Sequence, residues 1–207
     1  MFELHDDISF SECSQQDGAS LTPCSKTKEL LKKLEIPVGS KRYSEFLIGR
    51  QAAKRALGGE YFIGKAQTGE PIWPDGLIGS ISHTEGLAVA AVGSSEKFQA
   101  IGIDLENIDR KINIDISKRI CSDSEKQWLD TKEDLLKVFS SKEAIYKALF
   151  PICKTFFGFL DVELRPAGGG YTAQLNRALS SDLPEKFEFE VNFKKKDKHL
   201  LTYVILE

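Results

Sequence analysis

The segment Ile101-Gly102-Ile103-Asp104-Leu105-Glu106 has the alternating pattern of a β-strand. Side chains at alternate strand positions point to the same face, so Asp104 and Glu106 share one face and the apolar residues share the other. Two carboxylates spaced roughly 6–7 Å along one strand face can share a hard cation such as Mg²⁺. Alone, an Asp-x-Glu pair is a weak signal, because many solvent-facing strands carry acids.

A second acidic element lies in residues 139–147, which have a helical pattern. Glu143 and Lys147 are one turn apart there and share a face of the expected helix. A carboxylate from this helix would complete an oxygen-rich Mg²⁺ site with room for phosphate and water, and Lys142 and Lys147 would flank the phosphates. A favourable surface pair between Glu143 and Lys147 explains the same spacing equally well.

Composition limits the classes of function. The chain has 207 residues, 41% hydrophobic and 29% charged, with a net charge of −3, so no overall basic field indicates nucleic-acid binding. No apolar run has the length of a membrane span, and no charged start followed by an apolar core indicates a secretory signal, so we expect a cytoplasmic protein. The cysteines and histidines are scattered, which argues against a zinc cluster or a disulfide framework.

The chain as a whole has the pattern of an α+β protein with two halves, each a helix packed on a small antiparallel sheet. We place an N-terminal lobe at residues 1–100, whose first 25 residues form a partly ordered polar extension, and a C-terminal lobe at residues 101–207. Residues 40–57 form a helix, with Ser40 as N-cap and Gly58 after its end. Residues 78–83, 86–92 and 99–106 are expected to form one antiparallel meander.

Basic and polar residues of the first half are candidates for binding phosphate. Arg42 and Arg50 lie eight residues apart, about 80° around the helix axis, and both can reach one phosphate group from one side. His83 ends an expected strand, with Ser82 beside it, which suits phosphate hydrogen bonds. Two solvated arginines and a structural histidine are the commoner explanation of such residues.

Four ordered motifs together resemble the 4′-phosphopantetheinyl transferases, in particular the enterobactin-synthetase component D type. The resemblance covers roughly residues 40–165. The motifs are Gly69-Glu70-Pro71-x-Trp73-Pro74, Gly79-Ser80-Ile81-Ser82-His83, Ile101-Gly102-Ile103-Asp104-x-Glu106 and Phe139-Ser140-Ser141-Lys142-Glu143-Ala144-x-x-Lys147.

The resemblance implies an enzyme that moves the phosphopantetheine arm of coenzyme A onto a serine of an apo carrier protein (peptidyl, acyl or aryl), with Mg²⁺, and releases 3′,5′-ADP. It implies a pseudo-dimer of two similar lobes that is sufficient as a monomer. Siderophore or other nonribosomal peptide and polyketide synthesis is the expected context. By motif, the metal ligands would be Asp104, Glu106 and Glu143, the pyrophosphate ligands Lys142 and Lys147, and the other coenzyme A ligands Arg42, Arg50, Ser82 and His83.

The resemblance also leaves questions open. Thr68 stands where relatives often carry a basic residue, and the nearby Lys65 is a candidate substitute. Glu143 or its bound water would take the proton of the acceptor serine. Carrier proteins of this family are acidic helical bundles, so the docking surface would be a local basic patch, which the sequence does not place. A Mg²⁺-dependent phosphoester hydrolase and a non-enzymatic coenzyme A or carrier-binding module are the competing hypotheses.

Overall fold

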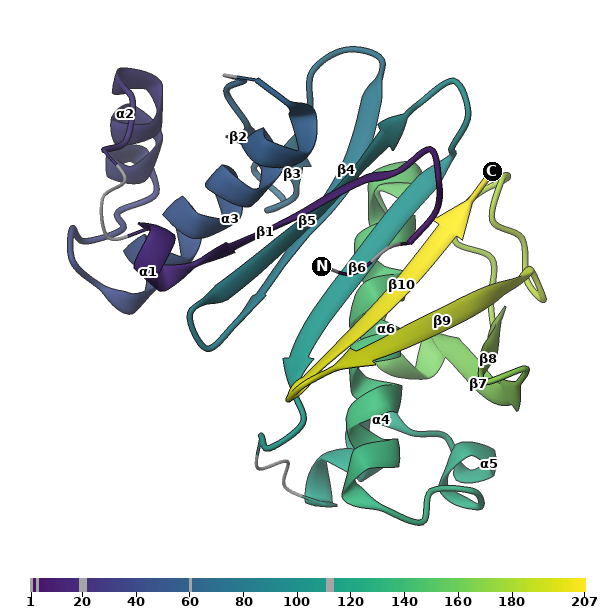
Figure 1. The fold of residues 1–207 in the computed structure, drawn as a ribbon. Helices are drawn as coiled ribbons and strands as arrows, with labels where there is room; N and C mark the ends of the chain where they lie inside the picture. Colours follow the sequence, from purple (N-terminus) through teal and green to yellow (C-terminus); the bar gives the residue numbers. More distant parts are fainter. Residues whose placement is uncertain (1, 3, 19–21, 60, 111–113) are drawn as a thin grey trace. The chain divides into compact units, whose positions relative to one another are not determined.

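The computed structural model describes residues 2, 4–18, 22–59, 61–110 and 114–207, and Figure 1 shows their helices and strands. The chain forms two compact units, Met1–Ile101 and Gly102–Glu207. Each unit has one long helix and an antiparallel sheet, so the predicted α+β class is confirmed. Within the described ranges, no helix has both the length and the hydropathy that crossing a membrane requires.

The N-terminal unit is built on a three-stranded sheet of order β1-β5-β4 and a two-stranded sheet of β2 and β3. Its long helix α3 lies against β1 and β5 (Figure 1). The helices are α1 (Gln15–Gly18), α2 (Ser25–Lys33) and α3 (Lys41–Leu57), and the strands are β1 (Ser9–Ser14), β2 (Gly64–Lys65), β3 (Pro71–Ile72), β4 (Leu77–Thr84) and β5 (Leu87–Ser94).

Helix α3 has the ends that its sequence predicts. The Ser40 hydroxyl accepts a hydrogen bond from the Tyr43 backbone N–H, and Gly58 has a left-handed conformation with φ of 67°. The small side chains of Ala52 and Ala53 are fully buried against the sheet in one core cluster. The face of α3 toward the sheet is therefore flat, which brings helix and sheet close together.

The N-terminal segment differs from the partly ordered extension that the sequence analysis placed at residues 1–25. Strand β1 pairs with β5 along its whole length, from Ser9 opposite Val92 to Ser14 opposite Leu87. The Ser11 hydroxyl also donates to the Ala52 carbonyl at 2.6 Å, which ties β1 to α3. Residues 1, 3 and 19–21 of this stretch lie outside the described residues.

Strand β1 also explains why the predicted meander is wrong. Strand β5 is central, with β4 on one edge and β1 on the other, so neither edge remains for the strand that follows it. Strand β6 (Ala100–Asn107) instead pairs with β10 in the other sheet. Asp104 and His83 therefore belong to different sheets, contrary to the prediction.

The C-terminal unit has a five-stranded sheet of order β6-β10-β9-β8-β7, covered on one face by α6 (Figure 1). Its other strands are β7 (Val162–Ala167), β8 (Gly170–Leu175), β9 (Glu188–Lys196) and β10 (His199–Leu206). Its helices are η1 (Ile114–Ile116), α4 (Ser117–Ile120), α5 (Asp123–Lys126), α6 (Lys132–Cys153) and η2 (Phe159–Asp161).

Helix α6 lies directly on strand β6 at Gly102. A Cβ atom added to Gly102 would overlap the carbonyl oxygen of Ala144 and the backbone nitrogen of Ala148. Only glycine permits this backbone contact, so Gly102 sets the distance between strand and helix. Capping boxes begin α5 at Ser122 and α6 at Thr131.

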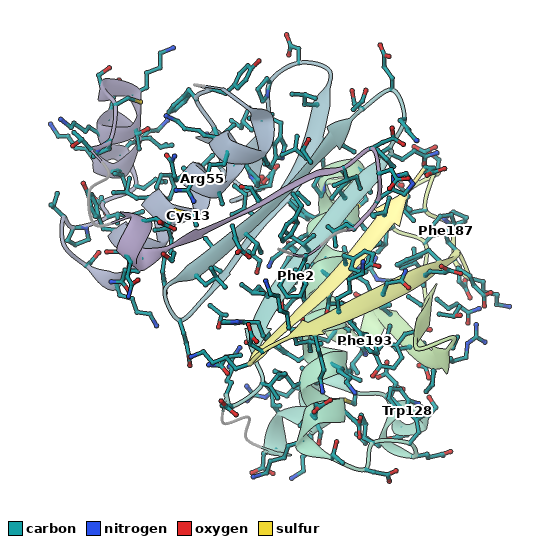
Figure 2. All side chains as sticks on the ribbon, viewed as in Figure 1. Phe2, Cys13, Arg55, Trp128, Phe187 and Phe193 are labelled. Carbon is teal, nitrogen blue, oxygen red and sulfur yellow. The ribbon has the colours of Figure 1, made fainter. Side chains whose placement is uncertain are left out.

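Aromatic rings anchor the segment between α5 and α6 to the sheet. Trp128 packs on Tyr171 with ring centroids 5.4 Å apart, and Tyr171 packs on Phe193 at 5.6 Å. Figure 2 labels Trp128 and Phe193. Such tilted contacts add to the free energy of burying large rings. They hold the start of α6 against β8 and β9.

Candidate active site

Asp104 and Glu106 are on one face of β6 and are both buried, at 5% and 6% exposure. The Asp104 carboxylate accepts hydrogen bonds from the Ser140 hydroxyl at 2.9 Å and from Lys147 Nζ at 2.6 Å. Both partners come from α6. The strand and the helix that the motifs singled out therefore meet at Asp104.

Glu106 is paired with a residue that the sequence analysis did not single out. Arg110, just beyond the end of β6, donates a hydrogen bond to Glu106 Oε1. The same guanidinium lies over the ring of Phe139, 5.2 Å from its centroid. The four-residue spacing from Glu106 to Arg110 is the one available signal in the sequence. It indicates an ion pair only in a helix, whereas Glu106 lies in a strand and Arg110 just beyond it.

Glu143 completes a group of three carboxylates, the acidic cluster of Asp104, Glu106 and Glu143. Burial raises the pKa of Glu143, and the Asp104 charge raises it further, while Lys147 and Arg110 oppose the rise. Burial also raises the pKa of Glu106, against the hydrogen bond from Arg110. The Asp104 charge thus acts on both glutamates, which places Asp104 near each of them.

The donor set of the acidic cluster fits a hard divalent cation. It offers carboxylate oxygens that are largely withdrawn from water and balanced by cationic side chains. In the part of the chain that the structure describes, no three His, Cys, Asp or Glu side chains already stand in metal-binding geometry. A cation would therefore take the places that Lys147 and Arg110 have beside Asp104 and Glu106.

Lys142 lies in the core, contrary to its predicted role in binding pyrophosphate. Its side chain is 1% exposed, and its Nζ donates to Glu125 Oε2 at 2.8 Å and to the Ile120 carbonyl at 2.7 Å. Glu125 also accepts from the backbone N–H groups of Ser122 at 2.7 Å and Leu164 at 2.8 Å. This buried ion pair joins α6 to α4, α5 and β7.

Arg42, Arg50 and Lys65 form a basic cluster in the N-terminal unit. The Arg50 guanidinium donates to the carbonyls of Ile63 and Gly64, both at 2.9 Å, and lies 4.5 Å from the Phe46 ring centroid. Burial lowers the pKa of Arg50 to about 10. Burial also lowers the pKa of Lys65, and the charges of Arg42 and Arg50 lower it further, so the three cations are neighbours.

The basic cluster contains two predicted phosphate ligands, Arg42 and Arg50, together with Lys65. Among described residues, no acidic side chain forms an ion pair with Arg42, Arg50 or Lys65. An anion such as a phosphate would relieve the repulsion that lowers the pKa of Lys65. Lys65, the candidate substitute for a basic residue at Thr68, thus lies near Arg42 and Arg50.

Ser82 and His83 differ in accessibility. Ser82 is buried at 4% exposure, whereas the His83 side chain is 46% exposed and has its Nδ1 3.9 Å from Glu45. Neighbouring strand residues point to opposite faces, so one ligand cannot approach both side chains from the same side. Of the two, His83 is the one open to a ligand.

A pocket of about 330 Å³ opens beside Glu143. Half of its lining residues are aromatic, and Tyr146 contacts the rings of Phe156 and Phe157 at 6.0 and 5.1 Å between centroids. The lining residues are Lys142, Glu143, Tyr146, Phe156, Phe157, Gly158, Phe159 and Val162. No motif of the sequence indicates this pocket, because its walls come from two separate segments, α6 and residues 156–162.

Two family models match the two parts of the chain that carry these residues. The model of the 4′-phosphopantetheinyl transferase N-terminal domain matches residues 37–93, and that of the 4′-phosphopantetheinyl transferase superfamily matches residues 100–204. The chain belongs to the 4′-phosphopantetheinyl transferase superfamily. The superfamily match includes the whole acidic cluster, and the N-terminal match includes the whole basic cluster.

Three curated relatives bear on the predicted type within the superfamily. The 4′-phosphopantetheinyl transferase Npt of Nocardia iowensis is 35% identical over 60% of this chain and 59% of its own length. PptT of Mycobacterium tuberculosis is 32% identical over 78% and 72%, and enterobactin synthase component D of Salmonella typhi is 36% identical over 53% and 49%. The matches thus span about half to three quarters of these proteins. The predicted family is confirmed, and identities this similar do not single out the enterobactin type.

A solved structure, the holo-[acyl-carrier-protein] synthase of Thermotoga maritima, aligns with a TM-score of 0.43 and 23% identity, over 53% of this chain and 64% of that one. This similarity is below the level that indicates a common fold.

Proposed function

We propose that this protein transfers the 4′-phosphopantetheine group of coenzyme A to a serine hydroxyl of an apo carrier protein and releases 3′,5′-ADP. The observation that carries the proposal is the acidic cluster, in which β6 and α6 bring Asp104, Glu106 and Glu143 together within the region that the superfamily model matches. Mg²⁺ held by these carboxylates would neutralise the pyrophosphate charge.

In the proposed reaction the serine oxygen attacks the phosphorus that bears the pantetheine. A new P–O bond forms to the serine, and the P–O bond to the phosphate of 3′,5′-ADP breaks, with its electron pair on the leaving oxygen. Glu143, directly or through a water molecule, accepts the serine proton. Its raised pKa makes it a stronger base than a glutamate with the usual pKa, which suits this role. Lys147, beside Asp104, supplies positive charge to the pyrophosphate.

The basic cluster suits the other charged part of coenzyme A. The 3′-phosphate carries up to two negative charges, and three neighbouring cations without an acidic partner favour such a group. We propose that Arg42 and Lys65 contact the 3′-phosphate together with His83, while Arg50 holds strand β2, which carries Lys65, by its bonds to Ile63 and Gly64. The predicted contact from Ser82 requires that its buried side chain become accessible.

The aromatic pocket suits the pantetheine arm. The arm is a long chain with few charges, and the pocket lies beside Glu143, where the reacting phosphate would be. The pocket therefore favours coenzyme A over a small phosphoester, which is an argument against the hydrolase hypothesis. Service to a siderophore or other nonribosomal peptide or polyketide pathway, a monomeric state and a cytoplasmic location complete the proposal.

Intact-mass spectrometry tests the reaction. The protein is mixed with coenzyme A, Mg²⁺ and a panel of apo carrier proteins, and we expect the mass of at least one carrier to increase by one phosphopantetheine group. A chelator should abolish the gain, and Glu106→Ala should lower kcat on the order of a hundredfold or more. Asp109→Asn, a change at an exposed acid near the end of the same strand, is the matched control.

The other outcomes separate the competing functions. Loss of coenzyme A without any carrier modification would identify a hydrolase. Binding of coenzyme A that is independent of metal, with no turnover on any carrier, would identify a binding module. Equal decreases in kcat for Glu106→Ala and Asp109→Asn would show that the acidic cluster has no special role in the reaction.

A further inference from the structure

One wall of the pocket beside Glu143 is formed by residues 156–159. Most of this wall belongs to residues 154–158, which lie between α6 and η2 and are in neither a helix nor a strand. Such a segment lacks the regular backbone hydrogen bonds that fix a helix or a sheet. The Phe156 side chain is also 77% exposed, so its own packing does not fix this part of the wall.

The residues that follow β8 supply contacts to this wall. Val162, the first residue of β7, is opposite Leu175, the last residue of β8, so Asp161 and Asn176 are the next residues to meet. The backbone N–H of Asn176 donates to the Asp161 carbonyl at 2.8 Å, and its side-chain amide donates to the Leu160 carbonyl at 2.9 Å. The end of β8 thus holds the end of η2.

Arg177, the next residue, connects both ends of the wall segment. Its Nε and Nη2 donate to the two carboxylate oxygens of Asp161 at 2.9 and 3.1 Å, and the same Nη2 donates to the Phe156 carbonyl at 3.1 Å. The Asp161 carboxylate also accepts from the Gly158 backbone N–H at 2.8 Å. The hydrogen bond from Arg177 lowers the pKa of Asp161, so this pair is ionised at neutral pH.

We propose that Arg177 is a positioning residue, which together with Asp161 holds the aromatic wall in the place where the pantetheine arm of coenzyme A packs. This proposal rests on the proposed function, because it takes the pocket as the site of the arm. A wall that is already ordered spares the ligand the entropic cost of ordering it. Arg177 acts through the backbone of the wall segment and lies outside all four sequence motifs.

Two other roles of Arg177 fit the structure less well. As a direct phosphate ligand it would have to give up donors that already serve Asp161 and the carbonyls of Phe156 and Ala178. A simple surface ion pair would not include a bond to the wall. Arg165 and Glu188 form such a simple pair on the same sheet, and neither of them lines the pocket.

Calorimetric titration with two ligands tests the positioning role. Coenzyme A carries the arm, and 3′,5′-ADP lacks it. We expect Arg177→Ala to weaken the binding of coenzyme A on the order of fivefold and to leave the Kd of 3′,5′-ADP unchanged. Arg177→Lys keeps the charge but not the planar fork, so it should not restore the affinity. In turnover, KM for coenzyme A should rise with kcat unchanged, because the arm is bound equally in the ground and transition states.

Hydrogen exchange shows whether Arg177 acts through the wall. In Arg177→Ala, the peptide of residues 155–162 should exchange faster, whereas the Tm should stay close to that of the wild type, because the ion pair is partly exposed. Phe156→Ala combined with Arg177→Ala should weaken coenzyme A binding by less than the product of the two single effects, because both changes affect the same wall. Arg165→Ala, the matched control, should change neither the exchange of this peptide nor the affinity.

The outcomes separate this proposal from the proposed function. Equal weakening of coenzyme A and 3′,5′-ADP binding in Arg177→Ala would overturn the positioning role, because Arg177 would then act on the nucleotide. Unchanged affinity for coenzyme A, with or without faster exchange, would also overturn only the positioning role. A wild type that binds coenzyme A more tightly than 3′,5′-ADP, and loses this difference in Arg177→Ala, but modifies no carrier would contradict only the proposed function.

Discussion

The basic cluster of the N-terminal unit and the acidic cluster of the C-terminal unit each gather three like charges, but they are compensated differently. Asp104 and Glu106 have internal cationic partners, Lys147 and Arg110. Arg50 is held by backbone carbonyls instead, and described residues provide no acidic partner for Arg42 or Lys65. The basic cluster therefore gains charge balance when an anion binds, whereas the acidic cluster must exchange one cation for another.

A third arrangement, the buried pair of Lys142 and Glu125, should give the largest effect on stability. Lys142→Met leaves a buried carboxylate without its cation, and we expect a loss of about 3–5 kcal/mol in the free energy of unfolding, measured with urea. Adding Glu125→Leu should restore only part of this loss, because it removes the unpaired buried charge but also the acceptor of the Ser122 and Leu164 backbone N–H groups. Lys147→Met, at a partly exposed site, should be much less destabilising. A stable Lys142→Met protein with weak coenzyme A binding would instead support the predicted phosphate role.

The anion-binding role of the basic cluster can be tested with two substrates. We expect Arg42→Gln or Lys65→Gln to raise KM for coenzyme A on the order of tenfold, about the effect of one charged hydrogen bond. With 3′-dephospho-coenzyme A, both variants should match the wild type. Lys41→Gln, next to Arg42 but with a side chain that is 82% exposed, is the control and should change neither value. An equal rise in KM with both substrates would show that these residues do not contact the 3′-phosphate.

The exchange of an internal cation for a metal ion in the acidic cluster predicts a smaller effect. Here the substitution should strengthen ligand binding, whereas the substitutions in the basic cluster weaken it. Arg110→Gln removes the internal competitor at Glu106 and should make Mn²⁺ bind more tightly, by roughly fivefold at most, because partly exposed ion pairs contribute little. Electron paramagnetic resonance of free Mn²⁺ measures this without any turnover. Weaker binding in the variant would show that Arg110 positions Glu106 for the metal rather than competing with it.

The smallest predicted effect concerns pH. Because burial raises the pKa of Glu143 above 4.5, the folded state binds more protons than the unfolded state between that value and the raised pKa. Stability therefore falls as pH rises through this window, and Glu143→Gln should remove the loss. We expect a higher Tm for the variant at pH 7.5, by about 2–4 °C per kcal/mol, and a smaller difference near pH 4.5.

A glutamate with the opposite shift provides the control for this pH effect. Lys195 and Lys137 lower the pKa of Glu133, so Glu133→Gln should reduce the Tm at neutral pH, and this reduction should diminish as the solution is acidified. Calorimetric scans of both variants across the same pH series show whether each substitution raises or lowers the Tm at each pH. If the Tm of Glu143→Gln and that of Glu133→Gln changed with pH in the same direction, the pKa shift of Glu143 would not come from its burial.

Local patterns in the sequence predicted the parts of the site that depend on one element. The alternation in β6 placed Asp104 and Glu106 on one face, and Ser40 and Gly58 marked the ends of α3. The spacing of Lys142 was also informative, because it lies in the same helical stripe as Val138, Ile145 and Leu149, all of which are buried. That stripe predicts a buried Lys142, but the motif led us to expect a phosphate ligand.

The missed features depend on contacts between distant segments. No local pattern shows that β1 occupies the second edge of β5 or that Glu125, the capping-box residue of α5, is the partner of Lys142. Lys65 was named only for its nearness to Thr68, and the structure brings it to Arg42 and Arg50 through the bonds from Arg50 to Ile63 and Gly64. Such tertiary pairs depend on how distant segments pack together, and the periodicity of the sequence does not reveal that packing.

The contact at Gly102 also links ligand binding to folding. Asp104 and Glu143 belong to elements separated in sequence by α4 and α5, and they come together only when β6 and α6 are packed at Gly102. The unfolded chain therefore has no equivalent cation site. A divalent cation held by these acids at a hundred times its Kd would stabilise the folded protein by about 2.7 kcal/mol. Cation concentration would thus control the survival of this enzyme against heat and proteases as well as its rate.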